Sequence, residues 1–175
     1  MSGIHQRLGL RRVINASGTM TDLGASIVGP EAREAIAEAL PEFFEMEALF
    51  REASRVIAQA TGAEAGLVTS SSASGITLAI AAAMTGDDLA AIERLPDTTG
   101  LRGEVVLLAG HAINFGAPVT QMIRLAGARP VIAGQATSSA SWQVAGAIGD
   151  RTAALLYVVS HHCARTEQVP LADFA

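Results

Sequence analysis

The sequence predicts an α/β fold in which a mostly parallel sheet is flanked by helices. Short apolar runs rich in Val, Leu and Ala recur from residue 65 onward. Each run is followed by a longer segment with helical periodicity, so that strands and helices alternate. The runs at 104–109 and 153–160 are almost continuously apolar, which is typical of strands that are covered on both faces in a parallel sheet.

Two helices are predicted before this alternation begins. Pro30 marks the start of the first, because proline is well tolerated in the first turn of a helix. The second extends over residues 45–60, where apolar side chains recur on one stripe, and Gly62 lies just past its end. We expect residues 1–29 to form an N-terminal segment and residues 30–175 to form the first part of a large α/β domain.

The alternation after residue 65 predicts four strands and the helices between them. The strands are expected at residues 65–68, 104–109, 131–133 and 153–160, and the helices at 72–85, 115–126 and 141–148. The polar stretch 93–103 is expected to be a surface loop, and another helix starts at about residue 170. Because so small a sheet followed by a beginning helix looks unfinished, we expect a truncated domain.

Composition and charge narrow the class of protein. Half of the 175 residues are hydrophobic, which is enough for a packed domain without a disulfide or a structural metal. The formal net charge is −5 and no basic cluster extends beyond Arg11 and Arg12, so nucleic acid is not an expected partner. The single cysteine, Cys163, excludes an internal disulfide and is typical of a reducing compartment, so we expect a cytoplasmic protein. Neither a signal peptide nor a membrane span is predicted.

Polar residues directly follow three of the predicted strands. They occupy residues 69–75, 110–114 and 160–163. Ligands of open α/β sheets bind at the carboxyl ends of the strands. Because parallel strands end at the same edge of a sheet, we expect these three segments to meet on one rim and to form a ligand site.

The serine run at residues 70–72 is the most informative of these segments. It lies between a strand and the first turn of a helix, where free backbone N–H groups and the positive end of the helix dipole favour an anion such as phosphate. A plain turn in which Ser72 is the helix N-cap fits the position equally well. The run is not a P-loop, because no Gly-Lys pair follows it, and the sequence has no Gly-x-Gly-x-x-Gly fingerprint.

The histidines allow several interpretations. His111 follows a strand and can stack on a flat ring, transfer a proton near neutral pH, or make only a structural hydrogen bond. His161, His162 and Cys163 are adjacent, and adjacent residues of an extended segment point to opposite sides. They lack the spacing of a structural zinc site, so we predict no metal and expect one of these histidines to face the ligand site.

Several short motifs connect these features to a known family. The first reads Val-Ile-Asn-Ala-Ser-Gly-Thr-Met at residues 13–20 and continues with Leu-Gly-Ala-Ser at 23–26; the others lie at 68–75, 84–88, 92–97, 157–163 and 170–171. In this order and spacing they resemble the N-terminal part of the selenocysteine synthase-like branch of pyridoxal-phosphate (PLP) enzymes. That branch includes the L-seryl-tRNA(Sec) selenium transferases and the D-glucosaminate-6-phosphate ammonia-lyases, and the resemblance covers essentially the whole chain.

This resemblance implies the fold, the cofactor and a set of site residues. The fold is the large domain of fold-type-I PLP-dependent transferases, and the cofactor is pyridoxal 5′-phosphate. Residues 70–73, called the serine loop below, would surround the cofactor phosphate, and His111 would stack on the pyridine ring. Ser160 and His161 would lie near the ring substituents or the substrate, with His161 as a candidate catalytic residue. The residues implied at the cofactor are Ser70, Ser71, Ser72, Ala73, His111 and Ser160.

The resemblance also implies an activity and an assembly. Enzymes of this branch are oligomers, so we expect a homo-oligomer with a small-molecule substrate. The activity would be that of a lyase or transferase acting on an amino acid or an amino-sugar phosphate. Because the sequence has no basic patch that could bind tRNA, it favours an ammonia-lyase over selenium transfer.

The sequence contains no lysine, since all 12 of its Lys and Arg residues are arginines. The family holds its cofactor through a lysine Schiff base and places an aspartate against the pyridine nitrogen, and the resemblance implies that both lie beyond residue 175. We therefore expect a cofactor-binding part that is not active alone and cannot attach the cofactor covalently. The alternative is a non-catalytic module that binds a phosphorylated ligand or a partner without Schiff-base chemistry.

Overall fold

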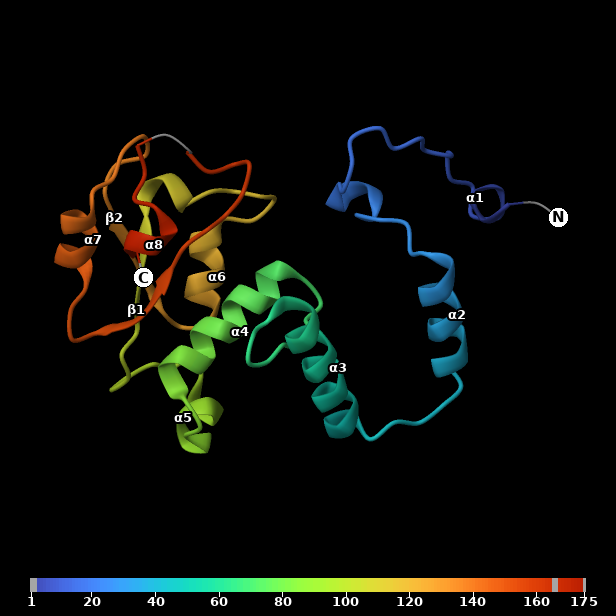
Figure 1. Cartoon of the computed structure of the whole chain (residues 1–175), viewed down its shortest axis with the longest axis horizontal. Coiled ribbons are helices and arrows are strands. Elements are labelled where there is room, and N and C mark those ends of the chain that lie inside the picture. Colours follow the sequence, from blue (N-terminus) through green and yellow to red (C-terminus); the bar gives the residue numbers. More distant parts are fainter. Residues whose placement is uncertain (1–2, 165–166, 175) are drawn as a thin grey trace. The chain divides into compact units, whose positions relative to one another are not determined.

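The computed structural model describes residues 3–164 and 167–174. The chain divides into two compact units, Met1–Leu67 and Val68–Ala175, which are described separately (Figure 1). The domain boundary predicted after residue 29 falls inside the first unit and stays a prediction.

The first unit consists of helices without a core of their own. They are α1 (Ile4–Arg7), α2 (Pro30–Ala39) and α3 (Met46–Thr61), with a short 3-10 turn, η1 (Thr21–Leu23), between the first two. The two longer helices lie where the proline and glycine signals predicted them. None of the described residues up to 67 is buried, and the side chains of Ile14, Ile27 and Phe43 are almost fully or fully exposed. The apolar side chains of this unit are therefore not covered within the unit itself.

The second unit is built on a three-stranded parallel sheet. Its strands are β1 (Glu104–Leu108), β2 (Arg129–Ala133) and β3 (Thr152–Leu156), in the order β2-β1-β3. The central strand β1 is completely buried from Val105 to Leu108, as its continuous apolar run predicted. The predicted fold class, a parallel sheet flanked by helices, is confirmed.

Two strand predictions are wrong: one strand does not form, and another is shorter than expected. Residues 65–68 are not part of a strand, and Leu67 and Val68 are exposed. An apolar run forms a strand only where a neighbour takes up its N–H and C=O groups, and among the described residues this run has no such neighbour. The strand expected up to residue 160 ends at Leu156, because the N–H group of Val158 is donated to His111 instead of to a neighbouring strand.

Helices cover both faces of the sheet. Figure 1 shows α6 and α7 on opposite sides of β1. Side chains of α4 (Ser72–Thr85) and α6 (Val119–Leu125) pack with Val105 and Leu107 in one cluster, whereas α7 (Ser141–Ala147) and α8 (Leu171–Phe174) pack with Val106 and Leu108 in the other. Because successive side chains of a strand point to opposite faces, the unbroken apolar run in β1 supplies buried side chains to the helix layers on both faces of the sheet.

Two helices differ from the predictions because of local capping. The helix expected from residue 115 begins only at Val119, since Pro118 takes the N-cap position and proline disfavours helical geometry in the residue before it. The helix α5 (Leu89–Arg94) was not predicted. Its residues 93 and 94 belong to the stretch 93–103, which was expected to be a surface loop. Asp88 caps it by accepting hydrogen bonds from the N–H groups of Ala90 and Ala91.

Candidate functional site

One of the three predicted rim segments, residues 110–114, contacts residues that flank another, residues 160–163. After β1 ends, the short helix η2 (Ala109–His111) carries His111 toward the residues that follow β3. The Nδ1 atom of His111 accepts a hydrogen bond from the N–H group of Val158 at 3.3 Å. The His111 ring also packs edge-on against Tyr157, with the ring centroids 4.4 Å apart. The carboxyl ends of two adjacent parallel strands therefore meet at this histidine, as the topology predicted.

The environment of His111 keeps its ring neutral. The residue is only 2% exposed, and burial lowers the pKa of its imidazole from the ordinary value of 6.5. Because Nδ1 accepts a hydrogen bond, the proton of the neutral ring lies on Nε2. His111 can therefore offer one N–H donor, but it does not carry a charge at neutral pH.

Close backbone approach fixes the chain around this histidine. The carbonyl oxygen of Gly110 accepts a hydrogen bond from the N–H group of Ala164 at 3.2 Å. A Cβ atom on Gly110 would lie 2.8 Å from the carbonyl oxygen of Ala136, which is too close for a side chain. Tyr157, for which no role was predicted, donates its hydroxyl hydrogen bond to the carbonyl oxygen of Val169 at 3.1 Å. Gly110 and Tyr157 thus attach the residues that follow β1 and β3 to the segment that leads into α8.

The serine loop is held in shape by a capping box. Ser71, rather than the predicted Ser72, is the N-cap of α4, because Ser71 has the extended backbone of a cap and its Oγ accepts a hydrogen bond from the N–H group of Ser74 at 3.2 Å. The Oγ atom of Ser74 in turn accepts from the N–H group of Ser71 at 3.1 Å and lies 2.9 Å from the Oγ atom of Ser70. Sequence reasoning gave no role to Ser74, although the Ser-x-x-Ser spacing is a variant of the capping-box signal.

This arrangement leaves a small set of donors at the start of α4. Among the hydrogen bonds of the described residues, the backbone N–H groups of Ser72 and Ala73 and the hydroxyl of Ser72 have no partner. The first N–H groups of a helix have no intrahelical acceptor and carry the positive end of its dipole. Three donors at the first turn of a 14-residue helix therefore match the oxygen atoms of a phosphate group.

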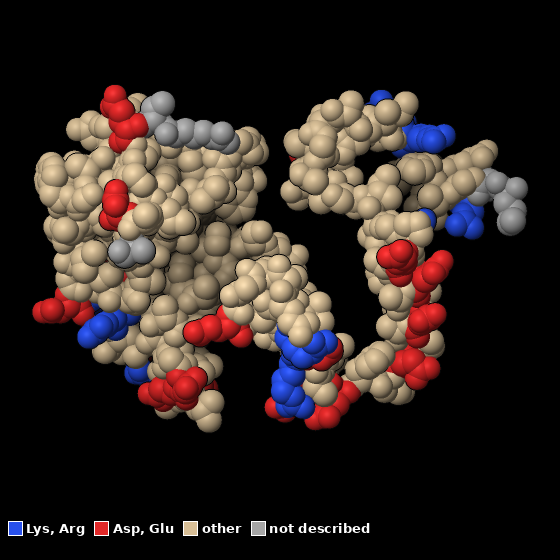
Figure 2. Space-filling model, viewed as in Figure 1, with Lys and Arg blue, Asp and Glu red and all other residues tan. Residues whose placement is uncertain are grey.

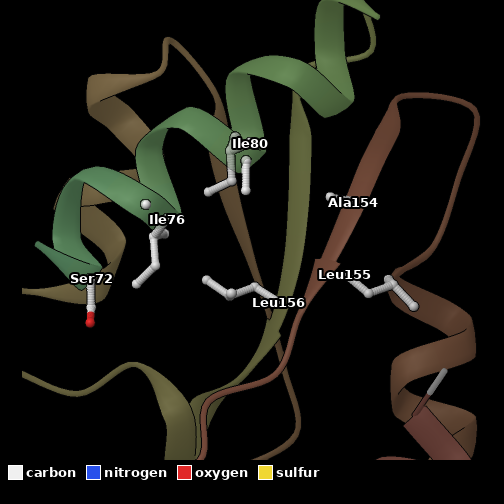
Figure 3. Close-up of a pocket in the computed structure, with 8 residues that line it drawn as sticks. Ser72, Ile76, Ile80, Ala154, Leu155 and Leu156 are labelled. Carbon is white, nitrogen blue, oxygen red and sulfur yellow. The ribbon is translucent and has the colours of Figure 1, made fainter. Parts of the chain in front are cut away.

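Ser72 also connects the serine loop to the sheet. It lies at one end of a hollow of about 370 Å³ between α4 and β3. Figure 3 shows Ser72 on the first turn of α4 with its hydroxyl directed away from the helix, while Leu156 of β3 points toward Ile76. The serine loop thus reaches β3, whereas no hydrogen bond or ring contact among the described residues joins it to His111.

The third segment is polar and mostly open. The Oγ atom of Ser160, which is half-buried, lies 3.2 Å from Nδ1 of His162 and accepts a hydrogen bond from the N–H group of His162, also at 3.2 Å. The rings of His161 and His162 are exposed and lie 3.9 Å apart. Among residues 3–164 and 167–174, no three His, Cys, Asp or Glu side chains come together as a set of metal ligands.

The face shown in Figure 2 has no broad basic surface. Arginines appear there as separate groups, and acidic side chains line α2. Both the Arg51–Glu47 and Arg55–Glu52 pairs on α3 are exposed ion pairs, which contribute little to stability. None of the helices in the described parts of the chain is long and apolar enough to cross a membrane.

The fold and the rim together define the class of protein. The parallel sheet covered by helices on both faces has the large-domain fold of fold-type-I PLP-dependent enzymes, which a structural match supports. A solved structure of a D-glucosaminate-6-phosphate ammonia-lyase matches 99% of this chain with a TM-score of 0.96 and 45% identity, and the match covers 47% of that structure.

Curated relatives agree with this structural match. The D-glucosaminate-6-phosphate ammonia-lyase of Salmonella typhimurium is 46% identical over 171 residues, which cover 98% of this chain and 46% of the relative. A 5′-C-glycyluridine monooxygenase-decarboxylase of Streptomyces sp. is 37% identical over 95% of the chain and 42% of its own length. An L-seryl-tRNA(Sec) selenium transferase of Nitratidesulfovibrio vulgaris is 27% identical over 89% of the chain and 33% of its own length. No family model matches the chain.

The resemblance predicted from the motifs is therefore confirmed. The chain is a homologue of the ammonia-lyase and selenium transferase branch, and it spans less than half the length of each of these relatives. Pyridoxal 5′-phosphate is the cofactor that this relationship implies. The donor set of the serine loop fits its phosphate group, but the sequence offers no lysine amine for its aldehyde.

Proposed function

We propose that this chain is the cofactor-binding half of a PLP-dependent lyase that acts on an amino-sugar phosphate. The observation that carries the proposal is the set of three free donors at the start of α4, formed by the N–H groups of Ser72 and Ala73 and the Ser72 hydroxyl. Neutral donors at a helix N-terminus bind an anion without a charged side chain, which suits a segment that has no lysine.

Each part of the rim has a separate task in this proposal. The serine loop binds the cofactor phosphate, and the Ser71–Ser74 capping box keeps its donors in place. His111 lies beside the cofactor ring as a neutral N–H donor or a stacking partner, held by Tyr157 and Val158. Ser160 and His161 face the substrate, where His161 is a candidate for moving a proton. The cofactor, once bound, supplies an electron sink for bonds that break next to an amine.

The choice of an ammonia-lyase follows from the relatives and from charge. The relative with 46% identity is named for D-glucosaminate 6-phosphate, a small amino-sugar phosphate. The selenium transferase has only 27% identity, and the net charge of −5 is unfavourable for tRNA. The proposal includes a homo-oligomer in the cytoplasm, because no disulfide can form within the chain and the first unit leaves its apolar side chains uncovered within itself.

A second candidate is a non-catalytic module that binds a phosphorylated ligand through the same serine loop. The absence of lysine from all 175 residues favours it, because the chain cannot hold an aldehyde covalently. Both candidates need the phosphate contact. They differ in whether turnover appears when the other half of a relative is present.

The phosphate contact is tested by calorimetry on the complete 175-residue chain. We expect pyridoxal 5′-phosphate to bind and pyridoxal, which lacks the phosphate, to bind at least about tenfold more weakly. Ser72→Glu places a carboxylate at the donor set and should abolish binding. Ser141→Glu makes the same change at the first residue of α7 and should leave binding unchanged. Equal affinities for the two pyridoxal forms would rule out the serine loop as the phosphate site.

The reaction is tested by mixing the chain with a polypeptide that has the sequence of the remaining part of the Salmonella relative. Release of ammonia from D-glucosaminate 6-phosphate would support the lyase. Phosphate-dependent binding without any turnover, in a mixture shown to associate, would favour the non-catalytic module.

A further inference from the structure

The segment after β3 forms a tight turn that brings two histidines together. The N–H group of Cys163 donates a hydrogen bond to the carbonyl oxygen of Ser160 at 3.2 Å, which closes the turn. The thiol of Cys163 donates a second one to the carbonyl oxygen of Val158 at 3.3 Å. Because the backbone turns here and is not extended, the rings of His161 and His162 lie 3.9 Å apart instead of on opposite sides.

Ser160 holds the ring of His162 through two contacts. Its Oγ atom accepts a hydrogen bond from the backbone N–H group of His162 and lies 3.2 Å from Nδ1 of the same residue. When the hydroxyl donates to Nδ1, the proton of the neutral ring lies on Nε2, and a protonated ring carries a hydrogen on both nitrogens. Among the described residues no hydrogen bond or ion pair occupies Nε2. This exposed N–H group is therefore available to a ligand.

The arginines described in the second unit belong to the opposite end of the sheet. They are Arg94 and Arg102 before β1, Arg124 and Arg129 at the entry to β2, and Arg151 before β3. Two of them already pair with Glu104. The strands are parallel, so their amino ends lie away from the carboxyl ends that the turn follows. Among the described residues of this unit, His161 and His162 are therefore the exposed side chains after a strand that can carry a positive charge.

We propose that Ser160 and His162 form a binding site for the phosphate group of the substrate. The proposal rests on the function proposed above, in which the substrate is an amino-sugar phosphate. Such a substrate brings a second phosphate besides that of the cofactor, and the serine loop serves the cofactor alone. The Nε2–H group of His162 donates to a phosphate oxygen, and the ring adds positive charge when it is protonated. His161 remains the candidate for proton transfer beside this site.

The carboxylate of a sugar acid is the competing ligand for the same two side chains. A phosphate monoester carries about two negative charges and three acceptor oxygens near neutral pH, whereas a carboxylate carries one charge and two oxygens. A proton on Nδ1 of His162 is donated to Ser160 and releases the hydroxyl hydrogen of Ser160 for the ligand. The pair then presents two donors and a positive charge, which suits the more highly charged phosphate better.

The experiment follows the ring C–H resonances of the four histidines by NMR in the complete 175-residue chain. D-glucosaminate 6-phosphate should shift the resonances of His162. D-glucosaminate, which has the carboxylate but no phosphate, should leave them unchanged at the same concentration. His162→Gln should weaken the binding of D-glucosaminate 6-phosphate, followed through the resonances of His161, by about tenfold or more, and Ser160→Ala should weaken it by about threefold to tenfold.

Two further variants show whether the effect belongs to this site. His5→Gln makes the same change at an exposed histidine of the first unit and should bind like the unchanged chain. Ser72→Glu blocks the serine loop and should leave the shift of His162 in place, so failure of the cofactor contact is measured separately. The proposal is overturned if D-glucosaminate shifts His162 equally, if Ser72→Glu removes the shift, or if His162→Gln binds as tightly as the unchanged chain.

Discussion

The two units of this chain have similar local sequence signals but very different packing. Residues 3–67 form an amphipathic helix, α3, and a proline-initiated helix, α2, yet none of the described residues in this unit is buried. In the second unit, strands and helices interleave, and every buried residue of the described chain lies between Ile80 and Phe174. Apolar periodicity is therefore enough to specify a helix, but a core needs a second layer to pack against.

The largest difference between the units should appear when apolar side chains are truncated. Leu107 is completely buried in the central strand, so Leu107→Ala should lower the free energy of unfolding by about 3–5 kcal/mol. Ile14 is 90% exposed, and Ile14→Ala should change it by less than about 0.5 kcal/mol. Urea unfolding followed by circular dichroism measures both. Equal losses would show that the first unit has a core after all.

Two glycines that follow helices also differ in packing between the two units, and here the expected difference in stability is smaller. Gly127 has φ +85°, and a Cβ atom there would collide with the carbonyl oxygen of Pro96. Gly127→Ala should therefore cost roughly 2–4 kcal/mol, from left-handed backbone strain together with overpacking. Gly62 has a similar φ of +76° but open space around it, so Gly62→Ala should cost only about 1–2 kcal/mol. Thermal unfolding of the two variants measures the difference in stability. A larger loss of stability for Gly62→Ala would contradict the open space around Gly62.

The sequence was sufficient for most of the order of elements and for one contact of the rim. Strand–helix alternation and continuous apolar runs located all three strands, and the carboxyl-end rule placed His111 next to the residues after β3. The short motifs were enough to indicate the branch of enzymes to which the chain is related. These features are local, or follow from the parallel direction of the strands.

What the sequence could not predict depends on partners that are distant along the chain. Residues 65–68 look like a strand, but whether a neighbouring strand pairs with them is not a local property. The helix N-cap was assigned to Ser72 instead of Ser71, because several adjacent serines fit the cap equally well and only the backbone angles decide. The contact between His111 and Tyr157 joins residues far apart in sequence, and no spacing rule would have found it.

The smallest expected effect concerns the histidines of the two units as pH falls. Burial lowers the pKa of His111 below its ordinary value, which the unfolded chain retains. Between these two pKa values the unfolded chain binds more protons than the folded one. The contribution of neutral His111 to the free energy of unfolding therefore has its full value above about pH 6.5, and it decreases as the pH falls further. Unfolding measured at about pH 7.5, 6 and 5 should show this decrease.

Two variants test whether His111 causes the decrease. His111→Gln, whose amide oxygen can still accept a hydrogen bond from the Val158 N–H group, should reduce the dependence of the free energy of unfolding on pH. His5→Gln, at an exposed residue of the first unit, should not reduce it. A slope that is the same in both variants would mean that other groups govern acid unfolding and that His111 is not the pH-sensitive part of the core.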